Sequence, residues 1–274
     1  MDTRYWGPSG WRFLHLLVSN PDLGIKNATT FFMLLPYVLP CKYCRASLTD
    51  YYTADPIPTN IKELPHWLYR IHNCVNAKLR EQNLVHTPDP SWSTVKSTYQ
   101  TLFRTPCTQT NLIGYDFFYS VAFTTPCKSV PSSPLPNAPP NLPTDALKNR
   151  WGVLPTAHRY KYIERWWRSI PAVMPYSSWS KAFQKALQSM PPLNRGRVAM
   201  TKWIFDAERD MCAALQASRP HTSFQMICTE LRTFSSNCGK YRPKARTCRS
   251  KQSISRTTLK KKRSSVYFAT GGFL

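Results

Sequence analysis

Prolines interrupt the chain most strongly between residues 126 and 143, where PCKSVPSSPLPNAPPNLP holds seven prolines in eighteen residues. Proline fixes φ and has no backbone N–H, so this stretch cannot continue a helix or a central strand. It predicts an extended linker that divides the body into residues 1–125 and 144–230. Just before it, within 106–143, we expect a connecting helix.

Both halves are predicted to be helical, because only nine glycines occur in 274 residues and alternation of apolar and polar residues is rare. The apolar spacing and capping residues indicate five helices in the first half. They are 9–19, one from Asn27 or Thr29 through FFMLLPYVL, 41–52, 61–80 capped by Asn60, and one from Ser91 to Phe103. We therefore expect an all-α chain that begins with a four-helix bundle and a fifth short helix.

The charge is strongly basic and uneven, with 37 Lys and Arg against 14 Asp and Glu, a net charge of +23. Residues 231–274 contain no acidic residue and are predicted to form a basic tail. Its run Lys260-Lys261-Lys262-Arg263 is a candidate contact for nucleic acid, nuclear import or an acidic virion surface. No apolar run approaches the roughly 20 residues of a membrane span, and Met1-Asp2-Thr3-Arg4 does not resemble a secretion signal.

Residues 144–230 repeat the first half faintly, since Pro36 and Pro40 align with Pro171 and Pro175. This favours a second helical domain that is a degenerate copy of the first, although an unrelated docking module remains the alternative. In this register the chemistry is lost, because Cys41, Cys44, His72 and Asn76 fall opposite Tyr176, Trp179, Glu208 and Cys212. The tryptophans of this half are expected in the core, with a docking face as the alternative; they are Trp151, Trp166, Trp167, Trp179 and Trp203.

Cys41-Lys42-Tyr43-Cys44 places two cysteines at the start of a predicted helix, where they can close into a disulfide. The helix dipole and the nearby Lys42 and Arg45 would stabilise a thiolate there. Zinc would require two further ligands, and no second Cys-x-x-Cys exists, so we expect no metal. A thioredoxin-type site would require a preceding strand, whereas LLPYVLP reads as the end of an apolar helix.

Three further groups could bind a flat aromatic ligand that carries phosphates. His72 and Asn76 lie one helical turn apart, with Asn73 and Lys78 beside them. Trp6, Trp11 and His15 on the first helix, and Trp92 with Tyr99 on the fifth, could supply aromatic walls. Taken alone, each group also fits ordinary packing of a helical bundle.

Together, Trp-Gly-Pro-x-x-Trp-x-x-x-His, Pro-Cys-x-x-Cys-Arg and His-Asn-x-Val-Asn-x-Lys-Leu resemble the flavin-dependent sulfhydryl oxidases of the Erv/ALR family, especially those of large DNA viruses. The resemblance covers about residues 4–103 and predicts an oxidase domain over 1–105. It implies FAD as cofactor. The matching contact positions are Trp6, Trp11, His15, Tyr43, His72, Asn73, Val75, Asn76, Lys78, Leu79, Trp92 and Tyr99.

The resemblance also implies a reaction, in which a substrate thiolate attacks Cys41 and releases Cys44. Cys44 then passes two electrons to FAD, and oxygen becomes hydrogen peroxide. Protein thiols and oxygen are the implied substrates, and a homodimer or an intrachain pseudo-dimer is the implied assembly. The expected location is the virion or the infected-cell cytoplasm, with the nucleus as an alternative.

Other cysteines depart from the family pattern, and an additional structural disulfide after the His-Asn helix is not evident. Cys107 and Cys127 each follow Thr-Pro and bracket a predicted helix; they are a candidate shuttle pair, a structural disulfide or two unrelated thiols. Cys74 is expected to be a buried small side chain. Cys228, Cys238 and Cys248 are expected to be free thiols or contacts with another chain. The alternative function is a virion scaffolding protein that uses the bundles and the tail for capsid or nucleic-acid contacts.

Overall fold

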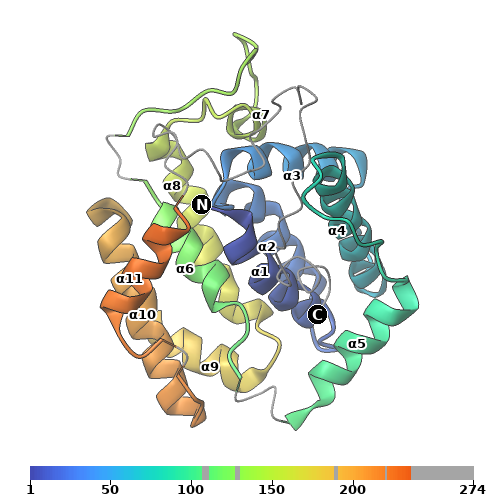
Figure 1. Cartoon of the computed structure of the whole chain (residues 1–274), viewed down its shortest axis with the longest axis vertical. Helices are drawn as coiled ribbons and strands as arrows, with labels where there is room; N and C mark the ends of the chain where they lie inside the picture. Colours follow the sequence, from blue (N-terminus) through green and yellow to red (C-terminus); the bar gives the residue numbers. More distant parts are fainter. Residues whose placement is uncertain (107–110, 127–129, 188–190, 220, 236–274) are drawn as a thin grey trace, which may run out of the picture.

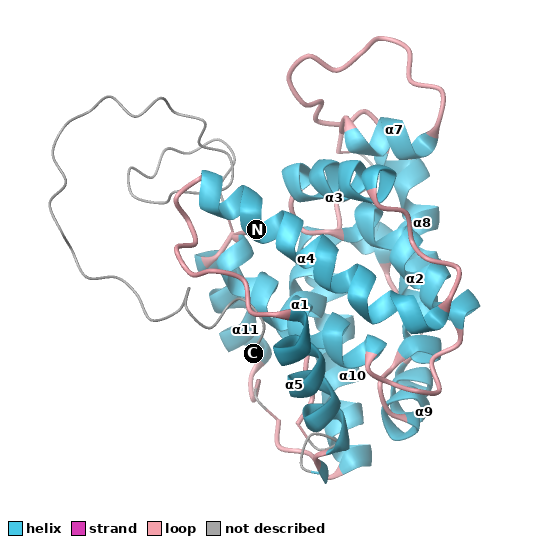
Figure 2. Cartoon of the chain, turned by 90° about the vertical axis from the view of Figure 1, so that its right-hand side faces the viewer, coloured by secondary structure: helices cyan, strands magenta, loops and turns pink. Residues whose placement is uncertain are grey.

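The structure, a computed structural model, describes residues 1–106, 111–126, 130–187, 191–219 and 221–235. These residues form helices, turns and loops without a strand, which confirms the all-α prediction (Figures 1 and 2). The helices are α1 Thr3–Val18, α2 Ile25–Val38, α3 Lys42–Ala54, α4 Leu64–Glu81, α5 Trp92–Arg104, α6 Tyr115–Thr124, α7 Asp145–Arg150, α8 Thr156–Ser169, α9 Ser177–Ala186, α10 Gly196–Leu215 and α11 Phe224–Thr233.

Two helices of the first half begin earlier than their sequence patterns predict. α1 starts at Thr3 and not near Ser9, because the side chain of Asp2 accepts the backbone N–H of Arg4 at 3.0 Å. α2 starts at Ile25 after Gly24, so neither Asn27 nor Thr29 is its cap. The starts of the later helices α3, α4 and α5 lie closer to their predicted positions.

Asn60 and Ser91 act as capping residues at the predicted positions. Asn60 accepts from Lys62 N and caps a 3₁₀ turn that leads directly into α4. Ser91 accepts from Thr94 N at 3.2 Å and caps α5. Each cap satisfies a backbone donor that would otherwise lack a partner at the helix start.

The apolar faces of both halves pack into one continuous core. α1 packs against α4, α5 and α6, while α2 packs against α3 and α8. Phe13, Phe31, Trp67 and Trp166 are fully buried members of this core. Burial of one such large side chain contributes about 1.5–3 kcal/mol to folding. The proline-rich segment therefore does not separate two independent cores.

Two glycines let α1 approach α6 closely. The hydrogen of Gly10 on α1 faces the ring of Phe117, whose Cγ would lie 3.3 Å from an added Cβ. Gly114 precedes α6 with φ +102°, and an added Cβ there would lie 2.9 Å from the Cβ of Phe13. Phe117 also lies against Trp6, with ring centroids 5.8 Å apart. α6 thus supports the α1 face that carries the predicted aromatic wall.

Four of the five tryptophans in the second half lie in the core, as expected. Trp166, Trp167, Trp179 and Trp203 are all buried. Trp151 is half-buried, and the guanidinium of Arg150 lies 3.9 Å from the centroid of its ring. The described residues therefore do not form a docking face from these tryptophan side chains.

Residues 130–143 of the proline-rich segment form a mostly exposed loop that rises beside α7, above α3 (Figure 2). Leu135 is buried and donates its N–H to Trp151 O at 2.8 Å. Lys42 donates to Ser133 Oγ at 2.9 Å, so the loop contacts the start of α3. The segment therefore contacts the Cys-x-x-Cys helix, and its role as a linker between two domains stays a prediction.

The sequence-based boundary at residue 231 places the start of the tail too early. α11 runs through Thr233, and Leu231 is fully buried. Phe234 stacks on Tyr5 at 4.7 Å, and its carbonyl accepts the N–H of Asp2. The apolar Leu231 and Phe234 explain why 231–235 join the body. Residues 236–274, including Cys238, Cys248 and the Lys260–Arg263 run, lie outside the described residues.

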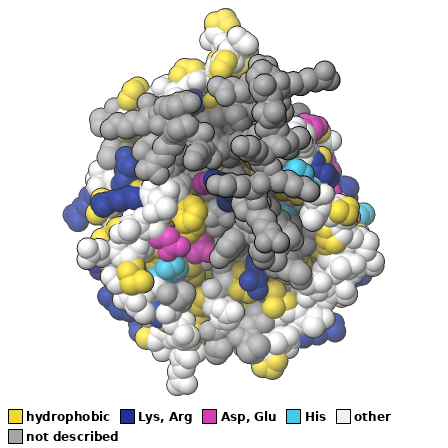
Figure 3. Space-filling view, viewed as in Figure 1, with side chains coloured by type: hydrophobic (Ala, Val, Ile, Leu, Met, Phe, Trp, Pro, Cys, Tyr) yellow, Lys and Arg dark blue, Asp and Glu magenta, His cyan; other side chains and the backbone are white. Residues whose placement is uncertain are grey.

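On the described part of the face in Figure 3, Lys and Arg are dispersed and a few Asp and Glu side chains lie near a histidine. None of the described helices is long and apolar enough to cross a membrane. The order α6, α8, α9, α10 follows the order expected of a second copy. The duplication and the domain limits stay predictions, which a superposition of 112–216 on 9–80 would test.

Candidate active site

The two motif cysteines lie at the start of α3, as the sequence predicts. Pro40 follows the end of α2, and Cys41 is the N-cap of α3 with extended backbone angles of −130° and 128°. Cys41 is buried, whereas Cys44 in the first turn is half-buried. The backbone N–H groups and the positive dipole of this turn favour negative charge on sulfur.

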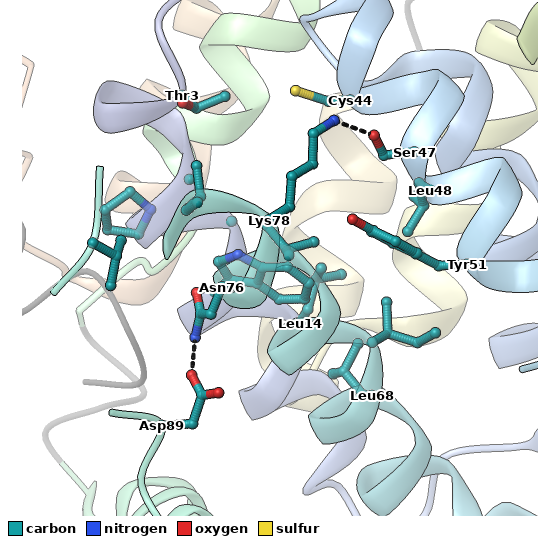
Figure 4. A pocket seen from close by; sticks show the side chains of 18 of the residues that line it. Thr3, Leu14, Cys44, Ser47, Leu48, Tyr51, Leu68, Asn76, Lys78 and Asp89 are labelled. Atoms are coloured by element: carbon teal, nitrogen blue, oxygen red, sulfur yellow. Dashed lines mark hydrogen bonds between the residues drawn. The ribbon is translucent and has the colours of Figure 1, made fainter. Parts of the chain in front are cut away.

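Cys44 lies on the wall of a cavity of about 460 Å³, within the usual range for a cofactor site (Figure 4). The cavity lies among α1, α3, α4, α5 and the loop 82–91, and Phe117 of α6 also reaches it. Its lining is mainly apolar and aromatic. A flat, largely apolar group could therefore lie beside the sulfur of Cys44.

Seven of the predicted site residues line this cavity. They lie on three helices, α1, α3 and α4, and are up to about 70 residues apart in the sequence. These residues are Trp6, Trp11, Cys44, Val75, Asn76, Lys78 and Leu79. Lys78 supplies the positive charge among these lining residues of α4. Its Nζ donates to Ser47 Oγ at 2.5 Å near Cys44 (Figure 4). An ammonium group and apolar walls in one cavity suit a ligand that is part aromatic and part anionic.

His15, His72 and Tyr99 form the layer behind the Trp11 wall. The rings of Trp11 and His72 stack with centroids 3.8 Å apart and planes 10° apart. His15 Nε2 and His72 Nδ1 are hydrogen-bonded at 3.1 Å, and His15 stacks on Tyr99 at 4.8 Å. Burial lowers the pKa of His15 to about 3 and the pKa of His72 well below its usual value. Both imidazoles are therefore neutral at neutral pH.

The remaining predicted residues do not line the cavity. Trp92 packs instead against His66 and Tyr69, with centroids 4.9 and 5.6 Å away. Tyr43 is half-buried beneath Lys42, whose Nζ lies 5.6 Å from its ring centroid. Asn73 is half-buried on α4, with a buried Oδ1 that has no hydrogen-bond partner.

The other predicted cysteines stand apart from the cavity or outside the described residues. Cys74 is exposed, so the expectation of a buried thiol was wrong. Cys74 lies seven residues after Trp67 on α4, so the helical period places it beside that buried residue, at the edge of the apolar face. The periodic pattern alone therefore does not separate an exposed thiol from a buried one at this position. Cys107 and Cys127 lie outside the described residues, so their role stays a prediction.

Several lining residues were missed by the sequence reasoning. Ser47 and Tyr51 lie three and seven positions after Cys44, so they share its face of α3. That spacing is a signal that could have found them. Burial raises the pKa of Tyr51 to about 12, which keeps its hydroxyl protonated at neutral pH.

Asp89 was also missed, because it lies in a loop without a periodic pattern. It accepts the amide of Asn76 at 2.7 Å and both arms of Arg80 at 2.9 and 2.7 Å (Figure 4). Burial opposes ionisation, but hydrogen bonds from Arg80 and Asn76 hold the pKa of Asp89 below its usual value. The carboxylate therefore fixes the loop 82–91 against α4, where the loop closes one side of the cavity.

Within the described residues no group of three or more His, Cys, Asp or Glu side chains is placed to hold a metal ion. The polar groups around the cavity fit an organic ligand instead. The indole Nε1 of Trp6 is buried without a hydrogen-bond partner, as is the hydroxyl of Tyr99 in the layer behind. Buried donors of this kind usually have partners. The Trp6 residue lines the cavity, while its Nε1 is enclosed by the protein, so its contribution to a ligand is the aromatic ring.

These features define a class of protein: a helical bundle with a Cys-x-x-Cys helix beside an aromatic cofactor-sized cavity. The comparisons show what this bundle is similar to. Residues 8–100 match the model of the Erv1 / Alr family, so this part of the chain is similar to that family. The match does not extend over residues 101–274.

A relative from Acanthamoeba polyphaga mimivirus is named "Probable FAD-linked sulfhydryl oxidase". It is 34% identical over 85 residues, which cover 28% of this chain and 59% of the relative. The chain thus spans about three-fifths of the length of that relative. No solved structure matches the chain significantly.

Proposed function

We propose that the chain is an FAD-linked thiol oxidase that forms disulfide bonds in protein substrates. The observation that carries the proposal is the position of Cys44, the second cysteine of a Cys-x-x-Cys helix start, on the wall of the large aromatic cavity. The family match over 8–100 and the name of the mimivirus relative support it. Both neighbours of the motif, Lys42 and Arg45, add positive charge that favours thiolates.

FAD fits the residues that line the cavity. Trp6 and Trp11 would flank an aromatic ring system, and Lys78 would face an anionic part. Bound FAD would accept two electrons from a dithiol and pass them to oxygen, giving hydrogen peroxide. The protein groups orient the sulfur, bury the site and keep the neighbouring imidazoles neutral.

The thiol chemistry proceeds on the two cysteines. A substrate thiolate attacks the sulfur of Cys41 in the Cys41–Cys44 disulfide, and a mixed disulfide forms as the Cys44 thiolate leaves. A second substrate thiolate then attacks the mixed disulfide and releases the Cys41 thiolate. The substrate leaves oxidised, and the cysteine pair holds two electrons. Cys44 faces the cavity, so it is the sulfur from which these electrons leave the pair.

The test uses the full chain. The purified protein should be yellow, should consume oxygen when given dithiothreitol, and should form one hydrogen peroxide per oxygen consumed. Cys44→Ser should lose turnover and keep the colour, because Cys44 is one of many lining residues. Cys74→Ser is the matched control, since its thiol is exposed and outside the cavity, and it should retain turnover.

A folded but colourless protein would contradict the oxidase proposal and favour the scaffolding alternative. Retained turnover in Cys44→Ser would contradict the role of that residue. We further propose that the enzyme acts in the virion or the infected-cell cytoplasm, because a viral oxidase can form disulfides where the host keeps thiols reduced. Fractionation of infected cells and purified virions tests that location.

A further inference from the structure

A second, much smaller cavity lies where the end of α2 and the start of α3 meet α6 and α8. Its volume is about 10 Å³, roughly the room that one water molecule or one monatomic ion requires. Arg45 of α3 and Arg159 of α8 both line it, together with Thr124 and Thr125 of α6. No acidic side chain lines this cavity.

Both arginines keep a buried donor without a partner. The Nε atoms of Arg45 and Arg159 are enclosed and make no hydrogen bond. Arg45 donates from Nη1 to Leu39 O at 3.0 Å, which leaves its Nε unused. The hydroxyls of Thr124 and Thr125 donate to carbonyls of their own helix and bond to neither Nε. Unsatisfied donors in such a place are uncommon in folded proteins.

The two guanidiniums meet no carboxylate at this cavity among the described residues. Buried charges are normally paired, because removing an isolated charge from water is costly. Burial lowers the pKa of Arg45, and burial together with the charge of Arg45 lowers the pKa of Arg159 to about 9. Arginine side chains stay protonated in proteins at neutral pH. Two positive side chains, each half-buried, therefore line one small space that no carboxylate lines.

We propose that Arg45 and Arg159 together bind one small inorganic anion of the halide class, with chloride as the physiological member. An anion in this cavity can accept from both Nε donors and neutralise the mutual repulsion of the guanidiniums. The volume excludes phosphate and carboxylate-bearing ligands, which require several atoms. The site does not depend on the flavin proposal, because it lies outside the large cavity.

The position of the site connects it to the cysteine motif. Arg45 directly follows Cys44, and its charge interacts with both Cys41 and Cys44. Arg159 belongs to the second half, so that half supplies a group close to the redox motif of the first. A bound anion would reduce the positive potential at the two sulfur atoms and so weaken the stabilisation of their thiolates.

The first test measures thermal unfolding of the full chain by far-ultraviolet circular dichroism while chloride replaces gluconate at constant ionic strength. Gluconate is too large for the cavity. Specific binding to the folded state should raise the Tm by about 2–4 °C near saturation. An equal Tm in the two salts would overturn the proposal. Crystals soaked in bromide should show an anomalous peak between Arg45 and Arg159, and its absence would also overturn it.

Matched variants separate the site from general salt effects. Arg159→Met should lose the chloride dependence, whereas Arg165→Met should keep it, because Arg165 is exposed on the same helix. Arg159→Lys keeps the charge and should retain part of the dependence, which covers the case in which Arg159→Met does not fold. Full chloride dependence in Arg159→Met would refute a site that requires this guanidinium.

Discussion

Replacing Gly114 by alanine should destabilise the contact between α1 and α6 more than the addition of a single methyl group suggests. Gly114 has φ +102°, a region that side chains with a Cβ rarely adopt. The added Cβ would also lie 2.9 Å from Cβ and 3.0 Å from Cγ of Phe13. Phe13 is fully buried between Phe31 and Phe118, with ring centroids 6.3 and 5.0 Å away, so its ring has little room to move.

The two effects should add because the backbone strain and the clash are separate costs. The left-handed conformation costs about 1–2 kcal/mol for a residue with a Cβ. Overpacking a filled core costs about 1–3 kcal/mol more. We therefore expect Gly114→Ala to lower the free energy of unfolding by about 2–5 kcal/mol. For a chain of this size the Tm should fall by roughly 5–15 °C.

The assay is chemical and thermal unfolding of the full chain followed by circular dichroism. Gly7→Ala is the control, because an added Cβ at Gly7 meets nothing within 4 Å and the residue lies inside α1. That variant should gain about 0.5–1 kcal/mol from higher helix propensity. If Gly114→Ala is as stable as the wild type, the close approach of α1 to α6 is not as described.

Three further predictions concern the candidate site. Asp89→Asn should weaken flavin retention roughly tenfold, measured by dialysis, because the loop loses its charge-assisted bond to Asn76. Unchanged retention would contradict a role of the loop 82–91 in flavin binding. Trp6→Phe should keep the fold but shift the visible flavin spectrum and lower affinity, since the cavity wall loses part of an aromatic ring. An identical spectrum and affinity would contradict that contact. The pKa values of His15 and His72 in the folded state lie below the unfolded value of 6.5. The stability that these neutral imidazoles give the folded protein is therefore complete above pH 6.5 and is lost as the pH falls toward 3. The Tm of His15→Gln should fall less steeply with decreasing pH than the Tm of the wild type.

Local sequence signals predicted the helices best where a side chain supplies the cap. Ser91 starts α5 because its hydroxyl accepts a backbone N–H one turn later, a rule readable from sequence. The start of α1 was missed because Pro8 lies inside the helix, and proline usually marks a helix start. The start of α2 was missed because Gly24 has no capping side chain, whereas the polar residues after it resemble caps.

The candidate site was predictable where one helix face carries it. Val75, Asn76, Lys78 and Leu79 are close in sequence on α4, and all reach the cavity. Asp89 was not predictable in this way, because its role depends on where the loop 82–91 folds back. The exposure of Cys74 could not be read from the helical period, because position 74 follows the buried Trp67 by seven residues and falls close to it around α4.

The family match ends at residue 100, but the packing of the cavity does not. Phe117 of α6 lines the cavity and lies against Trp6, and Phe234 after α11 stacks on Tyr5 in the same first turns of α1. The α1 wall is therefore held from outside by residues that follow the matched region. Because binding geometry at a cofactor depends on rigid support behind the contact residues, changes in α6 should alter the site without touching any residue of the family motif. Segments that follow the matched region, α6 and the end of α11, are thus part of the physical definition of this site, whether or not the second half descends from a copy of the first.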